Sequence, residues 1–179
     1  MGLFNLFGCS KAKEAPTAPK QPELKAVSYR GGVVTFRIPA HWREEYGADG
    51  GGIFYDTAPD AGTFRLDVLT VQSPSPVTAD SAPDILSKLR EASNGVERLP
   101  TGSALIRFTQ SSEERGHRLH ITYWTVANPI PPNHGRIANF SHTILDSQRS
   151  DPRFQRELEL LDREVRAAVF ASEIGVTSQ

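Results

Sequence analysis

The chain has 179 residues, of which 38% are apolar, and its formal net charge is −1. This length suits one domain, and the near-neutral charge provides no basic field that would attract nucleic acid. Cys9 is the single cysteine, so one chain contains neither a disulfide framework nor a multi-cysteine zinc site. No run of 18 apolar residues is present, as a membrane-spanning helix would require.

The N-terminal residues 1–28 are predicted to be a disordered tail and linker, because residues 11–27 are rich in Ala, Pro, Lys and Glu. The segment Leu6-Phe7-Gly8-Cys9 loosely resembles a bacterial lipobox, but no charged residue precedes Cys9. Two locations stay open. One is cytoplasmic, with residues 1–10 making weak or no membrane contact, and the other is membrane-anchored as a lipoprotein through Cys9. The single domain is predicted to span residues 29–172, and residues 173–179 to be a disordered C-terminus.

A strand is predicted at the start of the domain, where Val34, Phe36 and Ile38 alternate with more polar residues. Pro39 cannot donate to a sheet and ends the strand. Trp42 follows three residues later. We expect its ring to plug the end of the core, with the wall of a ligand pocket as the alternative.

The next segment is predicted to be a charged turn at residues 43–46, followed by a glycine-rich hairpin loop at residues 47–52. That loop lacks the lysine and the Ser/Thr of a phosphate-binding P-loop. Two strands follow at residues 53–55 and 63–72, the second of them partly covered on both faces. A short helix then begins, with Ser81 as N-cap, Asp84 in the capping box and a stop at Asn94-Gly95. Its buried stripe consists of Ile85, Leu86 and Leu89.

Three further strands are predicted at residues 104–108, 119–127 and 137–144, joined by a polar turn at 111–116 and a proline-rich loop at 128–135. The last helix has Asp151 as N-cap and Pro152 in its first turn. Its apolar stripe consists of Phe154, Leu158, Leu161, Val165, Ala168 and Val169. The charged residues on its other faces are expected to be solvated.

The element order β-β-β-α-β-β-β-α indicates an α+β domain. The order, the front motif Val34, Phe36, Ile38, Pro39 and Trp42, and the closing helix together resemble the Mog1/PsbP-like superfamily, which includes the DcrB-like domains of bacteria. The resemblance covers residues 29–172 and implies a six-stranded antiparallel sheet flanked by helices (an α/β/α sandwich). It also implies bacterial origin and a non-catalytic accessory role, because the group binds protein partners. No binding residues are shared across that group, so none is transferred.

The histidines are the first candidates for chemistry. His120 and His142 would lie opposite each other if the strands at 119–127 and 137–144 formed a symmetric hairpin. A zinc site needs at least one more protein ligand, and neither strand carries Asp or Glu. Ser141 and His142 are neighbours whose side chains diverge, and no Gly-x-Ser-x-Gly motif is present. The sequence therefore predicts no metal, no cofactor and no catalytic residue.

Three functions are weighed. The first is a chaperone-like protein-interaction module. Its partner surface is predicted at one sheet end, formed by Tyr46, Tyr55, Pro131, Pro132 and His134. The second is a domain that binds a small apolar ligand or lipid in a pocket between sheet and helix, formed by Trp42, Trp124 and Phe140. The third is an enzyme of unidentified type.

Overall fold

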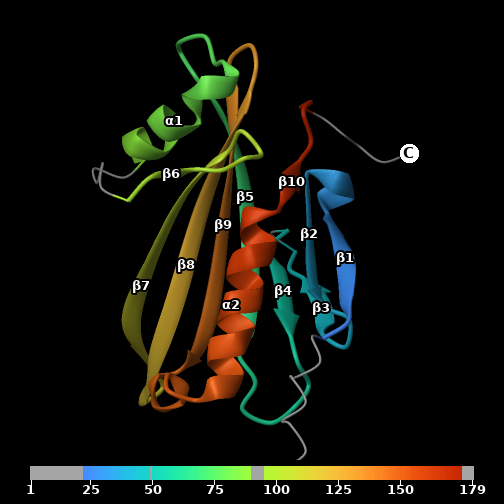
Figure 1. Cartoon of the computed structure of the whole chain (residues 1–179), viewed down its shortest axis with the longest axis vertical. Coiled ribbons are helices and arrows are strands. Elements are labelled where there is room, and N and C mark those ends of the chain that lie inside the picture. Colours follow the sequence, from blue (N-terminus) through green and yellow to red (C-terminus); the bar gives the residue numbers. More distant parts are fainter. Residues whose placement is uncertain (1–21, 49, 90–94, 175–179) are drawn as a thin grey trace, which may run out of the picture.

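The computed structural model describes residues 22–48, 50–89 and 95–174, and within them the chain forms ten strands and two helices (Figure 1). Short 3₁₀ turns at Arg30–Gly32, Ala79–Ser81 and Asp146–Gln148 link some of these elements. In chain order the elements are β1 (Leu24–Tyr29), β2 (Val34–Pro39), β3 (Arg43–Tyr46), β4 (Gly52–Tyr55), β5 (Thr63–Gln72), α1 (Ala82–Leu89), β6 (Glu97–Arg98), β7 (Ala104–Glu114), β8 (His117–Ile130), β9 (His134–Leu145), α2 (Pro152–Arg166) and β10 (Val169–Phe170).

The strands form two antiparallel sheets rather than the single six-stranded sheet that was predicted. The larger sheet has seven strands in the order β3-β4-β5-β9-β8-β7-β6, and the smaller has three in the order β1-β2-β10. The α+β class is therefore confirmed, whereas the sheet count is corrected. β2 pairs with β1 and β10 and with no strand of the larger sheet.

The main core lies between the seven-stranded sheet and a second layer made of α2 and the small sheet (Figure 1). The predicted apolar face of β2 is confirmed, because Val34, Phe36 and Ile38 are all buried. The ring of Phe36 meets Phe54 and Phe140 edge-on, with centroids 5.3 and 5.4 Å apart. Edge-to-face aromatic pairs of this kind add stability beyond their buried area. Phe36 thus joins the two sheets.

The shorter helix, α1, packs on the opposite face of the large sheet. Its Ala82 and Leu86 contact Ala104, Ile106 and Ala127 at one end of β7 and β8. β5 was expected to be partly covered on both faces. Its Phe64, Leu66 and Val68 are buried, but the other face is largely open, with Leu69 52% exposed. α1 is too short to cover the whole of that face.

Several element boundaries differ from prediction. The domain begins earlier, because β1 occupies residues 24–29, which were predicted to be linker up to residue 28. Residues 43–46 form β3 instead of a turn, and the hairpin strands run through most of the residues assigned to the 111–116 turn and the 128–135 loop. Residues 43–46 and 111–116 are polar because the first lie on an edge strand and the second on the exposed end of the β7–β8 hairpin, whereas Ile130 in the predicted proline-rich loop is buried. Residues 1–21, including Cys9, and residues 175–179 lie outside the described residues.

The last helix begins as predicted, with Asp151 as N-cap accepting a 2.7 Å hydrogen bond from the backbone N–H of Arg153. It ends at Arg166, so Val169 leaves the apolar stripe and is exposed on β10. Glu164 is buried, contrary to the predicted solvated face, and pairs with Arg37 at 2.7 Å. The capping box before α1 is formed by Thr78 and Ser81, one turn earlier than predicted. The Asn94-Gly95 stop includes Asn94, which lies outside the described residues.

Candidate functional site

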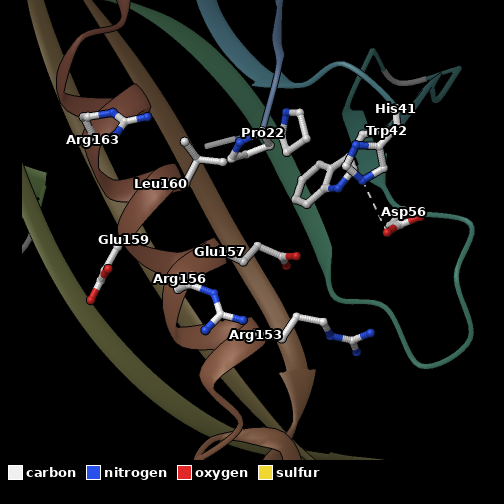
Figure 2. Close-up of a pocket in the computed structure, with 11 residues that line it drawn as sticks. Pro22, His41, Trp42, Asp56, Arg153, Arg156, Glu157, Glu159, Leu160 and Arg163 are labelled. Carbon is white, nitrogen blue, oxygen red and sulfur yellow. Dashed lines mark ion pairs between the residues drawn. The ribbon is translucent and has the colours of Figure 1, made fainter. Parts of the chain in front are cut away.

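A groove lies between α2 and the corner where β2 leads into β3. It has a volume of about 470 Å³ and is shown in Figure 2. We call it the α2 groove. Its lining comes from the chain before β1, the β2–β3 corner, the end of β4 and α2: Pro22, Pro39, His41, Trp42, Asp56, Arg153, Arg156, Glu157, Glu159, Leu160 and Arg163.

The corner that forms one wall is held by backbone and side-chain bonds. Pro39 ends β2, and the backbone N–H of Trp42 donates a 3.0 Å hydrogen bond to the Pro39 carbonyl. Lys25 Nζ donates to the Trp42 carbonyl at 2.6 Å and pairs with Glu44 at 2.9 Å. The Trp42 ring is 3% exposed and belongs to the main core, which confirms the predicted core plug. One edge of this residue also borders the groove.

The opposite wall is one side of α2. Arg153, Arg156, Leu160 and Arg163 recur at intervals of three and four residues, which places them along one face of a helix (Figure 2). Leu160 is buried between these charged residues and faces the corner. The groove therefore combines a small apolar floor with charges of both signs along its rim.

Some of these charges are already paired. His41 Nε2 lies 3.4 Å from Asp56 Oδ2, as the dashed line in Figure 2 marks. Glu157 Oε1 lies 2.7 Å from Nε2 of the buried His142 on β9. By contrast, Arg156 and Glu159 form no ion pair with any residue in the described ranges. Both side chains are exposed, and Glu159 points away from Trp42 in Figure 2.

The predicted pairing of the two histidines is wrong in register. His120 lies opposite Ile144, and His142 lies opposite Thr122. The two histidines are thus diagonal neighbours on one face of the sheet, because the β8–β9 hairpin turns about Pro132, where Ile130 pairs with His134. Within the described part of the chain, no three His, Cys, Asp or Glu side chains gather into a metal-binding group.

Comparison with known proteins gives structural matches without sequence matches. No family model and no curated sequence matches the chain. A structure from Bacteroides thetaiotaomicron VPI-5482 is 14% identical with a TM-score of 0.56, over 83% of this chain and 49% of that one, so the chain spans about half its length. LpqN of Mycobacterium tuberculosis, described as involved in cell envelope biogenesis, is 13% identical with a TM-score of 0.54, over 77% of this chain and 83% of that one.

The chain has the Mog1/PsbP-like fold. The Ran-binding protein Mog1p of Saccharomyces cerevisiae is also similar, at 11% identity and a TM-score of 0.45, over 84% of this chain and 96% of that one. At such identities the likeness concerns the fold alone. Among the described residues, no helix is both long and apolar enough to cross a membrane.

The Mog1/PsbP-like fold separates the residues predicted to form one partner surface. Tyr55 lies beside Thr63 at the start of β5, whereas His134 lies beside Gln72 at its end. These positions are nine residues apart, or roughly 30 Å along a strand. Pro131 and Pro132 form the exposed turn next to His134, so they too lie far from Tyr55.

Tyr46 lies near Tyr55, on the edge strand β3, and is 52% exposed. Its hydroxyl donates a 2.8 Å hydrogen bond to Glu44, and that of Tyr55 donates to Glu45. Burial and the bond to Glu44 raise the pKa of Tyr46 to about 12. The five predicted residues therefore form two separate surfaces, and neither contributes to the α2 groove.

The residues predicted to form an apolar pocket are also divided. Trp124 and Phe140 are fully buried in the main core, where Phe64 packs against both rings, and neither lines the groove. Only Trp42 of the three does so. Sequence reasoning missed the α2 side of the groove, because charged residues on an amphipathic helix are usually solvated. The interruption of that charged surface by Leu160 was the available signal.

Proposed function

We propose that the chain is a non-catalytic interaction module that binds a protein partner in the α2 groove. The observation that supports this most strongly is the combination of Arg156 and Glu159, which have no ion-pair partner in the described ranges, with the apolar floor of Trp42 and Leu160. An apolar centre surrounded by a charged rim is the usual anatomy of a protein interface.

A protein partner suits this groove better than a small apolar ligand. Small-molecule sites enclose most of their ligand in a mainly apolar cavity. Here three arginines and three carboxylates line an open groove along α2. A partner that places opposite charges beside Arg156 and Glu159 would gain specificity and a faster association rate. The fold adds an analogy only, because a shared fold does not define a function.

The arrangement of ionisable groups also favours binding over catalysis. His41 is the imidazole that faces the groove, and its side chain is 58% exposed beside Asp56. Its exposed imidazole is solvated, whereas catalytic groups commonly lie in closed sites that exclude water. His142 is buried, but its Nε2 is already bonded to Glu157.

The test is site-specific crosslinking followed by affinity measurement. A photoreactive residue at Arg156 should capture a protein in the cell of origin, whereas the same residue at Arg118, on the distal β7–β8 hairpin, should not. The captured partner is then purified. The charge exchange Arg156→Glu with Glu159→Lys should weaken its binding about tenfold or more, consistent with the loss of about 1.4 kcal/mol or more.

A matched control is available on the same hairpin. Glu113 and Arg118 are both exposed and lie opposite each other on β7 and β8. Exchanging their charges, by Glu113→Lys with Arg118→Glu, should leave partner affinity unchanged. Identical crosslinked products from both positions, or equal affinities of both exchange variants, would refute the proposed site.

A small apolar ligand is the second candidate, supported by Pro22, Pro39, Trp42 and Leu160 in the lining of the groove. Native mass spectrometry of the freshly purified protein tests it. A bound mass that disappears after Leu160→Asp would support this candidate. A single apo mass, with no change in tryptophan fluorescence on addition of lipid, would count against it.

Location is a separate proposal. The protein is proposed to be cytoplasmic, with attachment of a lipid to Cys9 as the alternative. Intact-mass measurement of the protein from its native cell distinguishes the two, because a diacylated Cys9 would appear as a large added mass. A free thiol at Cys9 would exclude the lipoprotein.

A further inference from the structure

A second cavity lies on the other side of the His142–Glu157 pair. Glu157 lines the α2 groove, whereas His142 lines this cavity, so the pair separates the two sites. The cavity has a volume of about 270 Å³ and is bounded by β7, β8, β9 and the first turns of α2. We call it the His120 cavity.

The floor of the His120 cavity carries buried polar groups that have no protein partner. His120 is 9% exposed and Thr122 is 1% exposed. Neither side chain makes a hydrogen bond or ion pair to a described residue. In the described ranges, two side-chain polar atoms are both without a hydrogen-bond partner and inaccessible to solvent, and they belong to Arg136 and Thr143, not to His120 or Thr122. The polar atoms of His120 and Thr122 therefore face the accessible space of the cavity.

Such an arrangement is costly without a ligand or water. A buried polar group that leaves bulk water and gains no partner is destabilising. The rim adds further donors, namely the guanidinium of Arg149, the hydroxyl of Thr109 and the side-chain amide of Gln155, all exposed. Ile144, Phe154 and Leu158 form the apolar remainder of the wall.

The electrostatics of the His120 cavity favour an anion. Among the residues that the structure describes, its lining includes one arginine and two histidines, and no carboxylate. Burial, the positive charge of Arg149 and the neighbouring His142 lower the pKa of His120, while Asp146 opposes them. The carboxylate of Glu157, on the other side of His142, is already paired with that histidine. An anion between His120 and Arg149 would relieve their repulsion and accept hydrogen bonds from both. The positive end of the α2 dipole lies on the same side.

We infer that the His120 cavity binds a small oxyanion, either a phosphate or a carboxylate group of a small molecule, with His120, Thr122 and Arg149 as its donors. A charge-assisted bond from a guanidinium, together with an imidazole N–H and a hydroxyl donor, is common recognition chemistry for such groups. The site is distinct from the α2 groove and does not depend on the function proposed for it.

The experiment follows the imidazole resonances of His120 by NMR in the intact protein during titration with sodium phosphate, and separately with sodium acetate. Sodium chloride keeps the ionic strength constant. The expected result is a saturable shift, together with a rise in the pKa of His120 once the anion is bound. Stronger binding of phosphate assigns a phosphorylated ligand, and stronger binding of acetate assigns a carboxylate.

Three variants make the result specific. Arg149→Gln should weaken anion binding about tenfold, because it removes one charge-assisted interaction. Thr122→Val keeps the shape of the side chain but removes its hydroxyl donor. It should weaken anion binding although the charge of the cavity is unchanged. Arg118→Gln removes an exposed arginine elsewhere on β8 and should change nothing. Shifts that do not saturate, an unchanged pKa of His120, or wild-type affinity in both Arg149→Gln and Thr122→Val would overturn the inference.

Discussion

The indole Nε1 of Trp124 donates a 2.7 Å hydrogen bond to Oδ1 of Asp162. Trp124 is fully buried on β8, and Asp162 lies on α2, so the bond joins the helix to the centre of the large sheet. The same carboxylate accepts a 2.6 Å bond from Arg166, and Arg107 lies 3.5 Å away with its guanidinium over the Trp124 ring. Asp162 is therefore the centre of a connected network.

Replacing Asp162 by Ala is expected to destabilise the fold. The buried indole N–H of Trp124 would lose its acceptor, which costs roughly 1–3 kcal/mol in the free energy of unfolding. Urea unfolding followed by circular dichroism measures this. Asp84→Ala, at an exposed position of α1, is the matched control and should change stability by less than about 0.5 kcal/mol. Equal stability of the two variants would show that the indole bond contributes nothing.

The same carboxylate should make stability depend on pH. Burial by itself would raise the pKa of Asp162, but the bonds from Trp124 and Arg166 and the charges of Arg166 and Arg107 hold it below its usual value. A lowered folded-state pKa gives stability that is fully present above the unfolded-state pKa, about 3.9. That contribution is lost as the pH falls through the folded-state pKa. The stability difference between wild type and Asp162→Asn should therefore be constant above about pH 5 and shrink in more acidic solution.

The sequence predicted the elements whose local patterns match their burial. Alternation at Val34, Phe36 and Ile38 identified β2, and Asp151-Pro152 identified the start of α2. β1 and β3 were missed, because an edge strand with one exposed side carries too many polar residues to alternate clearly. The division into two sheets was missed as well, because it depends on which strands β2 pairs with. The local residue pattern of a strand does not show which other strand it pairs with.

The candidate sites were less accessible to sequence reasoning. Trp42 was correctly placed at the end of the core, but the α2 groove depends on the approach of α2 to the Pro39–Trp42 corner. His120 was noticed as a candidate ligand, although with the wrong opposite residue. A shift of two residues in register places His120 opposite Ile144, instead of opposite His142 as a symmetric hairpin was expected to do, and leaves His120 and Thr122 on the floor of the cavity.

Gly62 is predicted to be intolerant of a side chain. A Cβ added there would lie 2.5 Å from His142 Nε2 and 3.0 Å from Glu157 Oε1. Gly62→Ala should therefore push His142 and Glu157 apart and cost roughly 1–3 kcal/mol in the free energy of unfolding, as overpacking does. Thermal or urea unfolding checks this.

The cause is tested by a double-mutant cycle. Glu157→Ala removes one of the three atoms that the new methyl group would meet, so the cost of Gly62→Ala should be smaller in the Glu157→Ala background. Strict additivity of the two substitutions would mean that the methyl group acts elsewhere.

Of the two tyrosines in the β3–β4 hairpin, Tyr46 and Tyr55, Tyr46 is predicted to lose its proton at the higher pH. Burial and the hydrogen bond to Glu44 raise its pKa to about 12. The folded state thus holds this proton more tightly than the unfolded state, in which tyrosine titrates near pH 10. Stability from this bond is present below about pH 10 and is lost as the pH rises towards 12. Ultraviolet titration of the phenolate should show a late step that Tyr46→Phe removes, whereas Tyr123→Phe should retain it.

Phe36 is predicted to be among the most sensitive core positions, because its ring contacts both sheets. Its centroid lies 5.3 Å from Phe54, 5.4 Å from Phe140 and 6.1 Å from Phe64. Phe36→Ala should cost about 3–5 kcal/mol in the free energy of unfolding, because it removes these contacts and leaves a cavity. Thr35→Ala, on the other face of β2, should cost about 1 kcal/mol or less. A small loss at Phe36 would mean that the small sheet can separate from the large one without disrupting the core, and denaturant unfolding followed by near-ultraviolet circular dichroism distinguishes the two outcomes.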